Sequence, residues 1–94
     1  MSRLVWSAAA RRDLARLREF IGEKDPVAAQ DAARRILRAA ALLPSRPELG
    51  RAVEGEAFRD LVAPSGRSGY VLRYRIDPEV VVIVRVWHTR EERE

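Results

Sequence analysis

Apolar residues recur along this chain first with the period of a helix and later with the period of a strand. The short apolar segment Arg3–Trp6 ends at Ser7, which predicts an opening strand and places Ser7 as the cap of a following helix. The next apolar residues are spaced by four, three and four positions, as on one face of a helix: Ala10, Leu14, Leu17 and Ile21. This spacing predicts an amphipathic helix of about four turns that ends near Gly22.

A second helix is predicted from Asp25, its cap, and Pro26, its first residue, to Pro44, where it stops. Its apolar stripe consists of Ala29, Ala33, Ile36, Ala40 and Leu43. Small alanine side chains let two helices approach closely, and only a few residues around Lys24 join the two segments. An antiparallel helical hairpin is therefore expected.

The remainder of the chain is predicted to complete a sheet. An irregular link, Pro44–Glu56, is rich in proline and glycine. Three strand-like segments follow, AFRDLVAP, YVLRYRI and VVVIVRVW, separated by turns at SGRSG and DPE. The pattern predicts one α+β domain over residues 1–94, in which the helical hairpin packs on one face of a mainly antiparallel sheet. The opening strand should join this sheet, at a position that the sequence does not fix.

Alternation assigns the last two strands to two faces, provided that the DPE link is a three-residue turn that places Tyr74 opposite Val82. The core face then holds Tyr70, Leu72, Tyr74, Ile76, Val80, Val82, Val84 and Val86. The opposite face holds Val71, Arg73, Arg75, Val81, Ile83, Arg85 and Trp87. Because a folded monomer seldom leaves so much apolar surface in water, we expect a partner to cover this second face. A shifted register, or a bulge near Arg85, would instead mix the two sets.

Composition narrows the possible functions. The chain has 94 residues, a net charge of +4, no cysteine and a single histidine. We therefore expect neither a disulfide framework nor a histidine-rich metal site, and we expect no cofactor. Seventeen arginines against one lysine suit an acidic partner, although a genome rich in G and C would produce the same ratio. No segment has the length of a signal peptide or membrane span, which predicts a cytoplasmic protein with no membrane partner.

His88 is the first candidate for acid–base chemistry, because histidine exchanges a proton near neutral pH. A histidine at a strand end is more often structural, and the chain has no nucleophile motif, glycine-rich phosphate loop or evident carboxylate pair. RNA cleavage through the ribose 2′-hydroxyl is conceivable with cations around the phosphate: Arg59, Arg73, Arg75, Arg85 and His88 supply those types. A lysine would suit the general base better than arginine, and the only lysine lies between the helices.

Nearly the whole chain resembles the ParE/RelE superfamily of bacterial toxins. The resemblance rests on an ordered series: a strand ending in Trp-Ser, an Ala/Asp/Leu helix, the Pro-x-x-Gly-Arg link, a following Arg, a Tyr-Arg strand and a last strand ending in His-x-Arg. It implies the toxin of a type II toxin–antitoxin system. It also implies a small ParD-like antitoxin that neutralises the toxin by wrapping an extended or helical segment around its helices and sheet.

The resemblance implies two alternative targets. RelE-like members cleave mRNA on the ribosome with lysine, arginine and a C-terminal tyrosine or histidine, and here only Arg59, Arg73, Arg75 and His88 match those roles by type. ParE-like members are described as inhibitors of DNA gyrase. We therefore favour a non-enzymatic gyrase inhibitor, with Arg59, His88 and Arg90 as possible target-binding residues and the second sheet face as the antitoxin site. A basic nucleic-acid-binding module is the third alternative.

Overall fold

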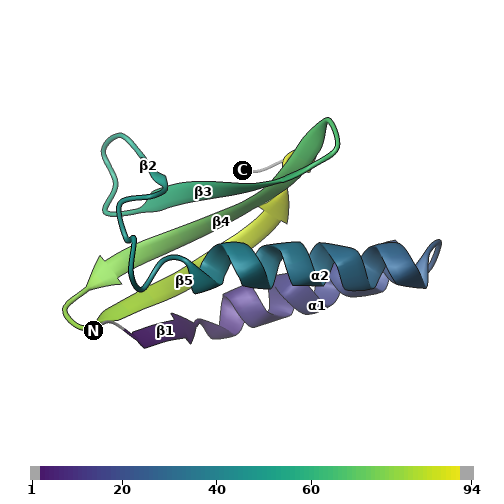
Figure 1. The fold of residues 1–94 in the computed structure, drawn as a ribbon, viewed down its shortest axis with the longest axis horizontal. Helices are drawn as coiled ribbons and strands as arrows, with labels where there is room; N and C mark the ends of the chain where they lie inside the picture. The colour runs from purple at the N-terminus through teal and green to yellow at the C-terminus, as the bar shows by residue number, and fades with distance from the viewer. Residues whose placement is uncertain (1–2, 92–94) are drawn as a thin grey trace.

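The computed structural model of the chain describes residues 3–91. Within them the elements follow in the order β1 (Arg3–Trp6), α1 (Ala8–Gly22), α2 (Pro26–Ala41), β2 (Arg51–Ala52), β3 (Arg59–Ser65), β4 (Ser68–Asp77) and β5 (Val80–His88). Figure 1 shows the two helices as an antiparallel hairpin that lies along one face of the sheet, with its far end extending past the strands. The predicted α+β architecture is confirmed.

Both helices begin at the predicted caps. The Ser7 hydroxyl accepts a hydrogen bond from the N–H of Ala10 at 3.0 Å. The Asp25 carboxylate likewise accepts bonds from the first turn of α2, which has proline at its first position. The second helix ends at Ala41, earlier than the predicted end at Pro44.

The sheet has the strand order β1-β5-β4-β3-β2. The opening strand β1 is an edge strand and runs parallel to β5, whereas the other neighbouring strands are antiparallel. The connection is long enough for this parallel pairing, because the helical hairpin and three strands intervene between β1 and β5. The link that was predicted to be irregular contains the two-residue strand β2.

The predicted register of the last hairpin is wrong by one residue. The turn is formed by Pro78 and Glu79 alone, with Asp77 paired to Val80 and a φ of 61° at Glu79. Proline followed by a residue with positive φ is the pattern of a type II turn. Tyr74 is therefore opposite Ile83 instead of Val82.

This shift exchanges the two faces of β5 near the turn. Val81 and Ile83, which were predicted on the partner face, are completely buried in the core. Three valines that were predicted in the core are only half-buried: Val80, Val82 and Val84. A one-residue slip has this effect because side chains alternate between faces along a strand.

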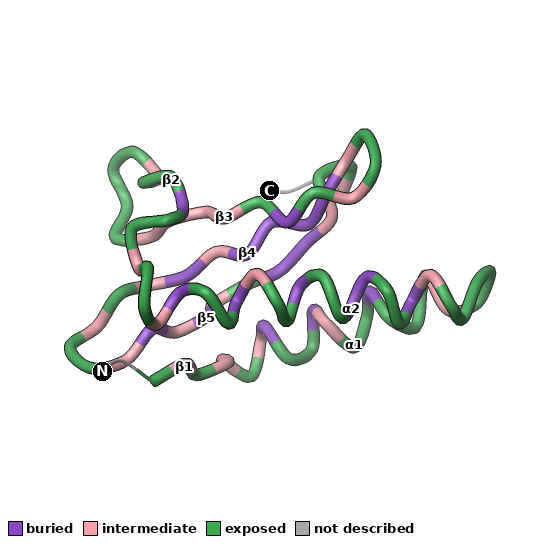
Figure 2. Tube along the Cα trace, in the orientation of Figure 1, coloured by how far each residue is buried: buried purple, intermediate pink, exposed green. Residues whose placement is uncertain are grey.

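A β-bulge then restores the predicted faces at the end of β5. The register changes between Arg73, which pairs with Arg85, and Tyr74, which pairs with Ile83, so Val84 is the extra residue. Val86 is consequently buried in the core, as predicted, and the core face of β4 is confirmed for Tyr70, Leu72 and Tyr74. Ile76, which was also predicted on the core face, is instead 44% exposed near the turn at the end of β4. Figure 2 shows buried positions on the inner turns of both helices and along β4 and β5.

Tyr74 fixes the link between helix and sheet. Its hydroxyl donates to the carbonyl of Pro47 at 2.6 Å and accepts from the N–H of Gly50 at 2.8 Å. A β-carbon at Gly50 would lie 2.7 Å from the tyrosine ring, so this position needs glycine. The Pro-x-x-Gly-Arg motif therefore has a structural reason.

Candidate functional site

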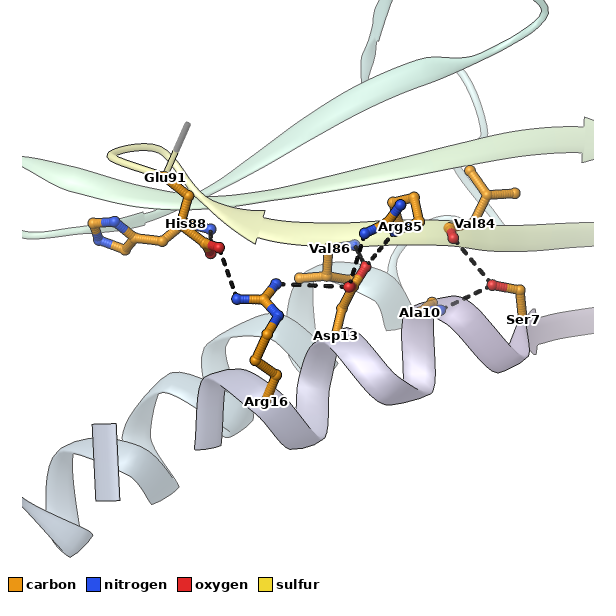
Figure 3. Close-up of polar contacts among 9 residues, drawn as sticks. All are labelled: Ser7, Ala10, Asp13, Arg16, Val84, Arg85, Val86, His88 and Glu91. Carbon is orange, nitrogen blue, oxygen red and sulfur yellow. Dashed lines mark hydrogen bonds and ion pairs between the residues drawn. The ribbon is translucent and has the colours of Figure 1, made fainter. Parts of the chain in front are cut away.

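Arg85 belongs to the part of β5 that does not pair with β1. After Trp6 the chain leaves the sheet, and α1 runs along the remaining edge of β5 (Figure 3). Ser7 marks this point, because its hydroxyl donates to the carbonyl of Val84 at 3.0 Å while also capping α1. The helix therefore replaces the missing strand along this edge.

Asp13 of α1 is the acid that Arg85 faces. Its carboxylate is almost completely buried and accepts two bonds from the Arg85 guanidinium, at 2.8 and 3.1 Å, and one from the N–H of Val86 at 2.8 Å. Burial raises the pKa of Asp13, but the bonds from Arg85 and Val86 and the charges of Arg85 and Arg16 outweigh it and leave the pKa below its ordinary value. The same contact raises the pKa of Arg85.

Sequence reasoning missed Asp13, although a signal was present. It lies three residues after Ala10 and four before Leu17, both of which are buried, so it occupies the buried side of the helix. A carboxylate at such a position requires a partner, and Arg85 is the arginine in an otherwise apolar strand. The arginine expected to meet another protein is thus paired within the chain.

A second ion pair ties the C-terminal turn to α1. Arg16 donates to the Glu91 carboxylate at 2.7 Å, and the other oxygen of that carboxylate accepts from the backbone N–H of His88 at 2.8 Å (Figure 3). Beside this pair is a groove of about 540 Å³ between α1 and the ends of β4 and β5. It is lined by Arg16, Leu17, Phe20, Ile21, Tyr70, His88, Arg90 and Glu91.

The groove combines apolar walls with a charged rim that contains Arg16, Arg90 and Glu91. Phe20 is 65% exposed there, an unusual exposure for a large aromatic side chain, and Leu17 and Tyr70 form its buried floor. Burial raises the pKa of the Tyr70 hydroxyl. Arg16 and Arg90 are exposed at the rim. Such a site fits apolar side chains, and Arg90 favours a carboxylate beside them, because Arg16 already pairs with Glu91.

His88 has the wrong tautomer for activating Ser68. Its Nε2 lies 3.0 Å from the Ser68 hydroxyl, which resembles a nucleophile–base pair. However, its Nδ1 accepts a hydrogen bond from the N–H of Arg90 at 3.1 Å, so the ring proton is on Nε2 and is donated to Ser68. The ring also packs edge-on against Tyr70, with centroids 5.2 Å apart. These contacts give His88 a structural part at the end of β5.

Arg73 is held on the opposite face of the sheet. It forms a bidentate ion pair with Asp60, at 2.8 and 3.0 Å, and this bond raises its pKa. Its guanidinium also lies 5.1 Å from the Trp87 ring centroid and 5.9 Å from that of Phe58. Trp87 is only 9% exposed, so this part of the face is already covered by the chain itself.

The four residues that match RelE-like roles by type do not form one cluster. Arg59 donates to the backbone carbonyl of Gly50 at 2.7 Å, and Arg75 pairs with Asp77 at 3.0 Å. His88 is opposite Tyr70, on the helix side, whereas Arg73 and Arg75 project from the other face of β4. Tyr70 and Arg75 are five residues apart along β4, or about 17 Å at strand geometry.

The predicted antitoxin face is therefore smaller than the sequence suggests. Val81 and Ile83 are buried in the core instead, and Arg85 is paired with Asp13 at the edge of the sheet. Val71, Arg73, Arg75 and Trp87 stay on the side away from the helices. Val62 of β3, opposite Val71, is 50% exposed on the same side.

No group of three histidine, cysteine or carboxylate side chains within residues 3–91 is placed to hold a metal ion. In the same residues no helix is long and apolar enough to cross a membrane.

Comparisons with known proteins identify relatives along nearly the full chain. A family model described as "ParE toxin of type II toxin-antitoxin system, parDE" matches residues 4–93. Two relatives from Caulobacter vibrioides are Toxin RelE3, 42% identical over 84 residues, and Toxin RelE1, 38% identical over 87. These alignments cover 89% and 93% of this chain and 90% and 92% of the relatives.

Two solved structures have a similar fold. A chain of the chromosomal ParDE system from P. aeruginosa has a TM-score of 0.80 at 22% identity, over 94% of this chain and 96% of that one. A chain of the RelBE2 toxin–antitoxin complex from Mycobacterium tuberculosis has a TM-score of 0.65 at 28% identity, over 93% and 96%.

Proposed function

The chain belongs to the ParE/RelE superfamily of type II toxin–antitoxin toxins, and from this premise we propose that it arrests growth by binding and poisoning DNA gyrase. It acts by binding and not by cleaving RNA. A cognate antitoxin neutralises it in a hetero-oligomeric complex.

The separation of the RNA-cleavage candidates carries this proposal. Cleavage through the ribose 2′-hydroxyl needs a base, an acid and free cations around one phosphate. Here Arg73 and Arg75 are paired with carboxylates on one side of the sheet, and His88 lies on the other side. In addition, the backbone N–H of Arg90 donates a hydrogen bond to Nδ1 of His88. The lone pair on that nitrogen is therefore already engaged and does not serve as a base.

The groove beside Phe20 is the proposed docking site for the antitoxin. Its exposed aromatic side chain supports binding of apolar residues, and the exposed Arg90 supports binding of carboxylates. Phe20→Ala should weaken antitoxin binding at least tenfold while leaving the fold intact, because the ring is mostly exposed. Val27→Ala is the matched control, since Val27 is 76% exposed outside the groove. Equal losses in titration calorimetry would show that the groove is not the interface.

The gyrase proposal is tested with purified protein in two assays. In a supercoiling assay the chain should inhibit gyrase, and an equimolar amount of antitoxin should restore activity. In ribosomes programmed with mRNA the message should stay intact. Cleaved message with unaffected supercoiling would overturn the proposal.

A ribosome-dependent endoribonuclease is the second candidate, favoured by the RelE names of the two Caulobacter relatives. In that case His88→Ala or Arg75→Ala should abolish cleavage, whereas Arg46→Ala, an exposed arginine outside the candidate set, should not.

A further inference from the structure

The outer sides of α1 and α2, which are turned away from the sheet, are exposed to solvent (Figure 2). Arginine is the residue type that recurs there. The five exposed arginines that form this surface come from both helices, and we call them the helical arginine set: Arg11, Arg12, Arg18, Arg34 and Arg38.

On α2 the helix period places two of these arginines opposite the core. Ile36 and Ala40 are completely buried, and Arg34 and Arg38 are each two residues from Ile36, which is about 200° around the helix. Arg35 lies to the side instead, where it donates to the carbonyl of Pro64. Because Arg34 and Arg38 are four residues apart, they are neighbours on the outer side, about 6 Å apart along the helix.

On α1 a second pair lies beside α2. Arg11 and Arg18 are seven residues apart, so they share one side of the helix and are separated by about 10 Å along it. Arg18 lines a shallow groove of about 450 Å³ between the two helices, with Ala15, Glu19, Gly22, Pro26, Ala29 and Gln30. Arg12 is two residues from the buried Ala10 and therefore lies on the outer side as well. The helical arginine set thus extends across both helices.

The charges of this set are not neutralised within the chain. Among residues 3–91 none of the five guanidinium groups forms an ion pair or a hydrogen bond with another side chain. Asp31 is already paired with Arg35 at 2.8 Å, and this bond, with smaller contributions from the charges of Arg34 and Arg38, lowers its pKa. Glu19 is the exposed carboxylate of α1. Five positive charges therefore face little negative charge on this surface.

The arginines on the sheet are in a different state. Each of three arginines on β4 and β5 is paired with a carboxylate at 2.8–3.0 Å: Arg73, Arg75 and Arg85. A polyanion therefore meets more uncompensated charge on the hairpin than on these strands.

The chemistry of the surface fits phosphate groups in a duplex. Guanidinium groups bind phosphates in a bidentate manner. Phe20 is the only aromatic residue in α1 and α2, and it lines the other groove, beside the C-terminal turn. Bases of a single strand therefore have no ring to stack on, and a protein segment has no aromatic anchor. The separations of about 6 and 10 Å match two and three nucleotides at about 3.4 Å each along one strand.

We propose that the outer face of the helical hairpin binds the phosphate backbone of double-stranded DNA, through the helical arginine set and without regard to base sequence. The binding needs neither gyrase nor an antitoxin, because the surface and its charges belong to the chain alone. If the chain also binds gyrase, as proposed above, the duplex that it contacts is the one on which gyrase acts.

Fluorescence anisotropy of a short labelled duplex, titrated with the purified chain, tests the proposal. The affinity should fall about a hundredfold between about 50 and 200 mM salt, as expected for about four phosphate contacts. A duplex of another sequence should bind within twofold of the first. An absence of binding at the lower salt concentration would overturn the proposal. Tighter binding of the single strand, or equally effective displacement by polyglutamate, would assign the surface to another occupant and would also overturn it.

Two double variants locate the binding surface. Arg34→Gln combined with Arg38→Gln should weaken binding at least tenfold and reduce the salt slope by about 2. Arg51→Gln combined with Arg67→Gln removes the same charge from exposed positions in β2 and in the turn between β3 and β4, and should weaken binding less than threefold. Equal losses would show general electrostatic attraction and contradict binding by the hairpin.

Circular dichroism spectra that match the wild type would establish that both double variants are folded, as expected because all four arginines are exposed. The titrations contain no gyrase and no antitoxin. Failure to bind DNA would therefore leave the proposed function standing, and failure of the supercoiling assay would leave the DNA-binding surface standing.

Discussion

Replacing Asp13 with alanine removes the acceptor of three hydrogen bonds at once. The Arg85 guanidinium loses both of its bonds to the carboxylate, and the buried N–H of Val86 loses its partner. No other described side chain bonds to that N–H. The substitution therefore tests whether α1 substitutes for a strand along the edge of β5.

The magnitude follows from burial. An N–H that is left buried without a partner costs about 1–3 kcal/mol. The ion pair contributes about 1 kcal/mol or less, because the Arg85 side chain is 45% exposed and can be hydrated when the acid is removed. Asp13→Ala should therefore lower the free energy of unfolding by about 2–4 kcal/mol, out of roughly 5–14 kcal/mol for a chain of this length.

Urea unfolding followed by tryptophan fluorescence measures this loss, together with Asp13→Asn and Asp31→Asn. Asparagine at position 13 can still accept from Val86, so it should cost only about 1 kcal/mol. Asp31 forms an equally short but exposed ion pair with Arg35, and its substitution should leave the midpoint almost unchanged.

The pH dependence has a defined sign. Because the pKa of Asp13 in the folded state is below its ordinary value of 3.8, its contribution is present above pH 3.8 and is lost as the pH falls through the folded pKa. The stability difference between wild type and Asp13→Asn should therefore shrink below pH 3.8. A loss below about 0.5 kcal/mol for Asp13→Ala, within the range of ordinary surface substitutions, would refute the reasoning.

Three further substitutions, with Gly66→Ala as a control, test the packing and the helix cap around the site. Gly50→Ala should cost about 2 kcal/mol or more in urea unfolding, since its β-carbon would lie 2.7 Å from the Tyr74 ring, whereas Gly66→Ala, with no atom within 4 Å, should cost about 1 kcal/mol from its positive φ alone. Tyr74→Phe should cost about 1–3 kcal/mol because the buried N–H of Gly50 loses its acceptor, and retained stability would contradict the anchoring of the link. Ser7→Ala should lower the melting temperature by about 4–8 °C, from loss of about 1 kcal/mol of helix capping; an unchanged melting curve would show that the cap is dispensable.

Local patterns were sufficient for the starts and the buried faces of the helices, although α2 ends at Ala41, before the predicted Pro44. Ser7 and Asp25 were identified as caps because short oxygen-bearing side chains satisfy the first N–H groups of a helix, and this depends only on neighbouring residues. The buried faces of α1 and α2 followed from the spacing of Leu17, Ile36 and similar residues. The residue order of the ParE/RelE superfamily then predicted how these elements assemble.

The two faces of β5 could not be assigned from the sequence, because they depend on the length of one turn and on one bulge. A two-residue turn at Pro78–Glu79 moved Val81 and Ile83 into the core, and the extra residue Val84 returned Val86 to it. The valines and the isoleucine that alternate along β5 are about equally apolar. No local preference therefore indicates which of them face the core. The register is chosen by the fit of the whole strand against β4 and the helices.

The sequence by itself thus determined both helices, every strand except β2, the fold class and the superfamily, because these are encoded by neighbouring residues and their order. Only the tertiary structure decided what Arg85 contacts. Asp13 and Arg85 are 72 positions apart in the chain, and their pairing exists because α1 runs along the edge of β5 where β1 has ended. The same geometry satisfies the outward backbone groups of Val84 and Val86, because side chains can do so only where the fold brings them within hydrogen-bonding distance.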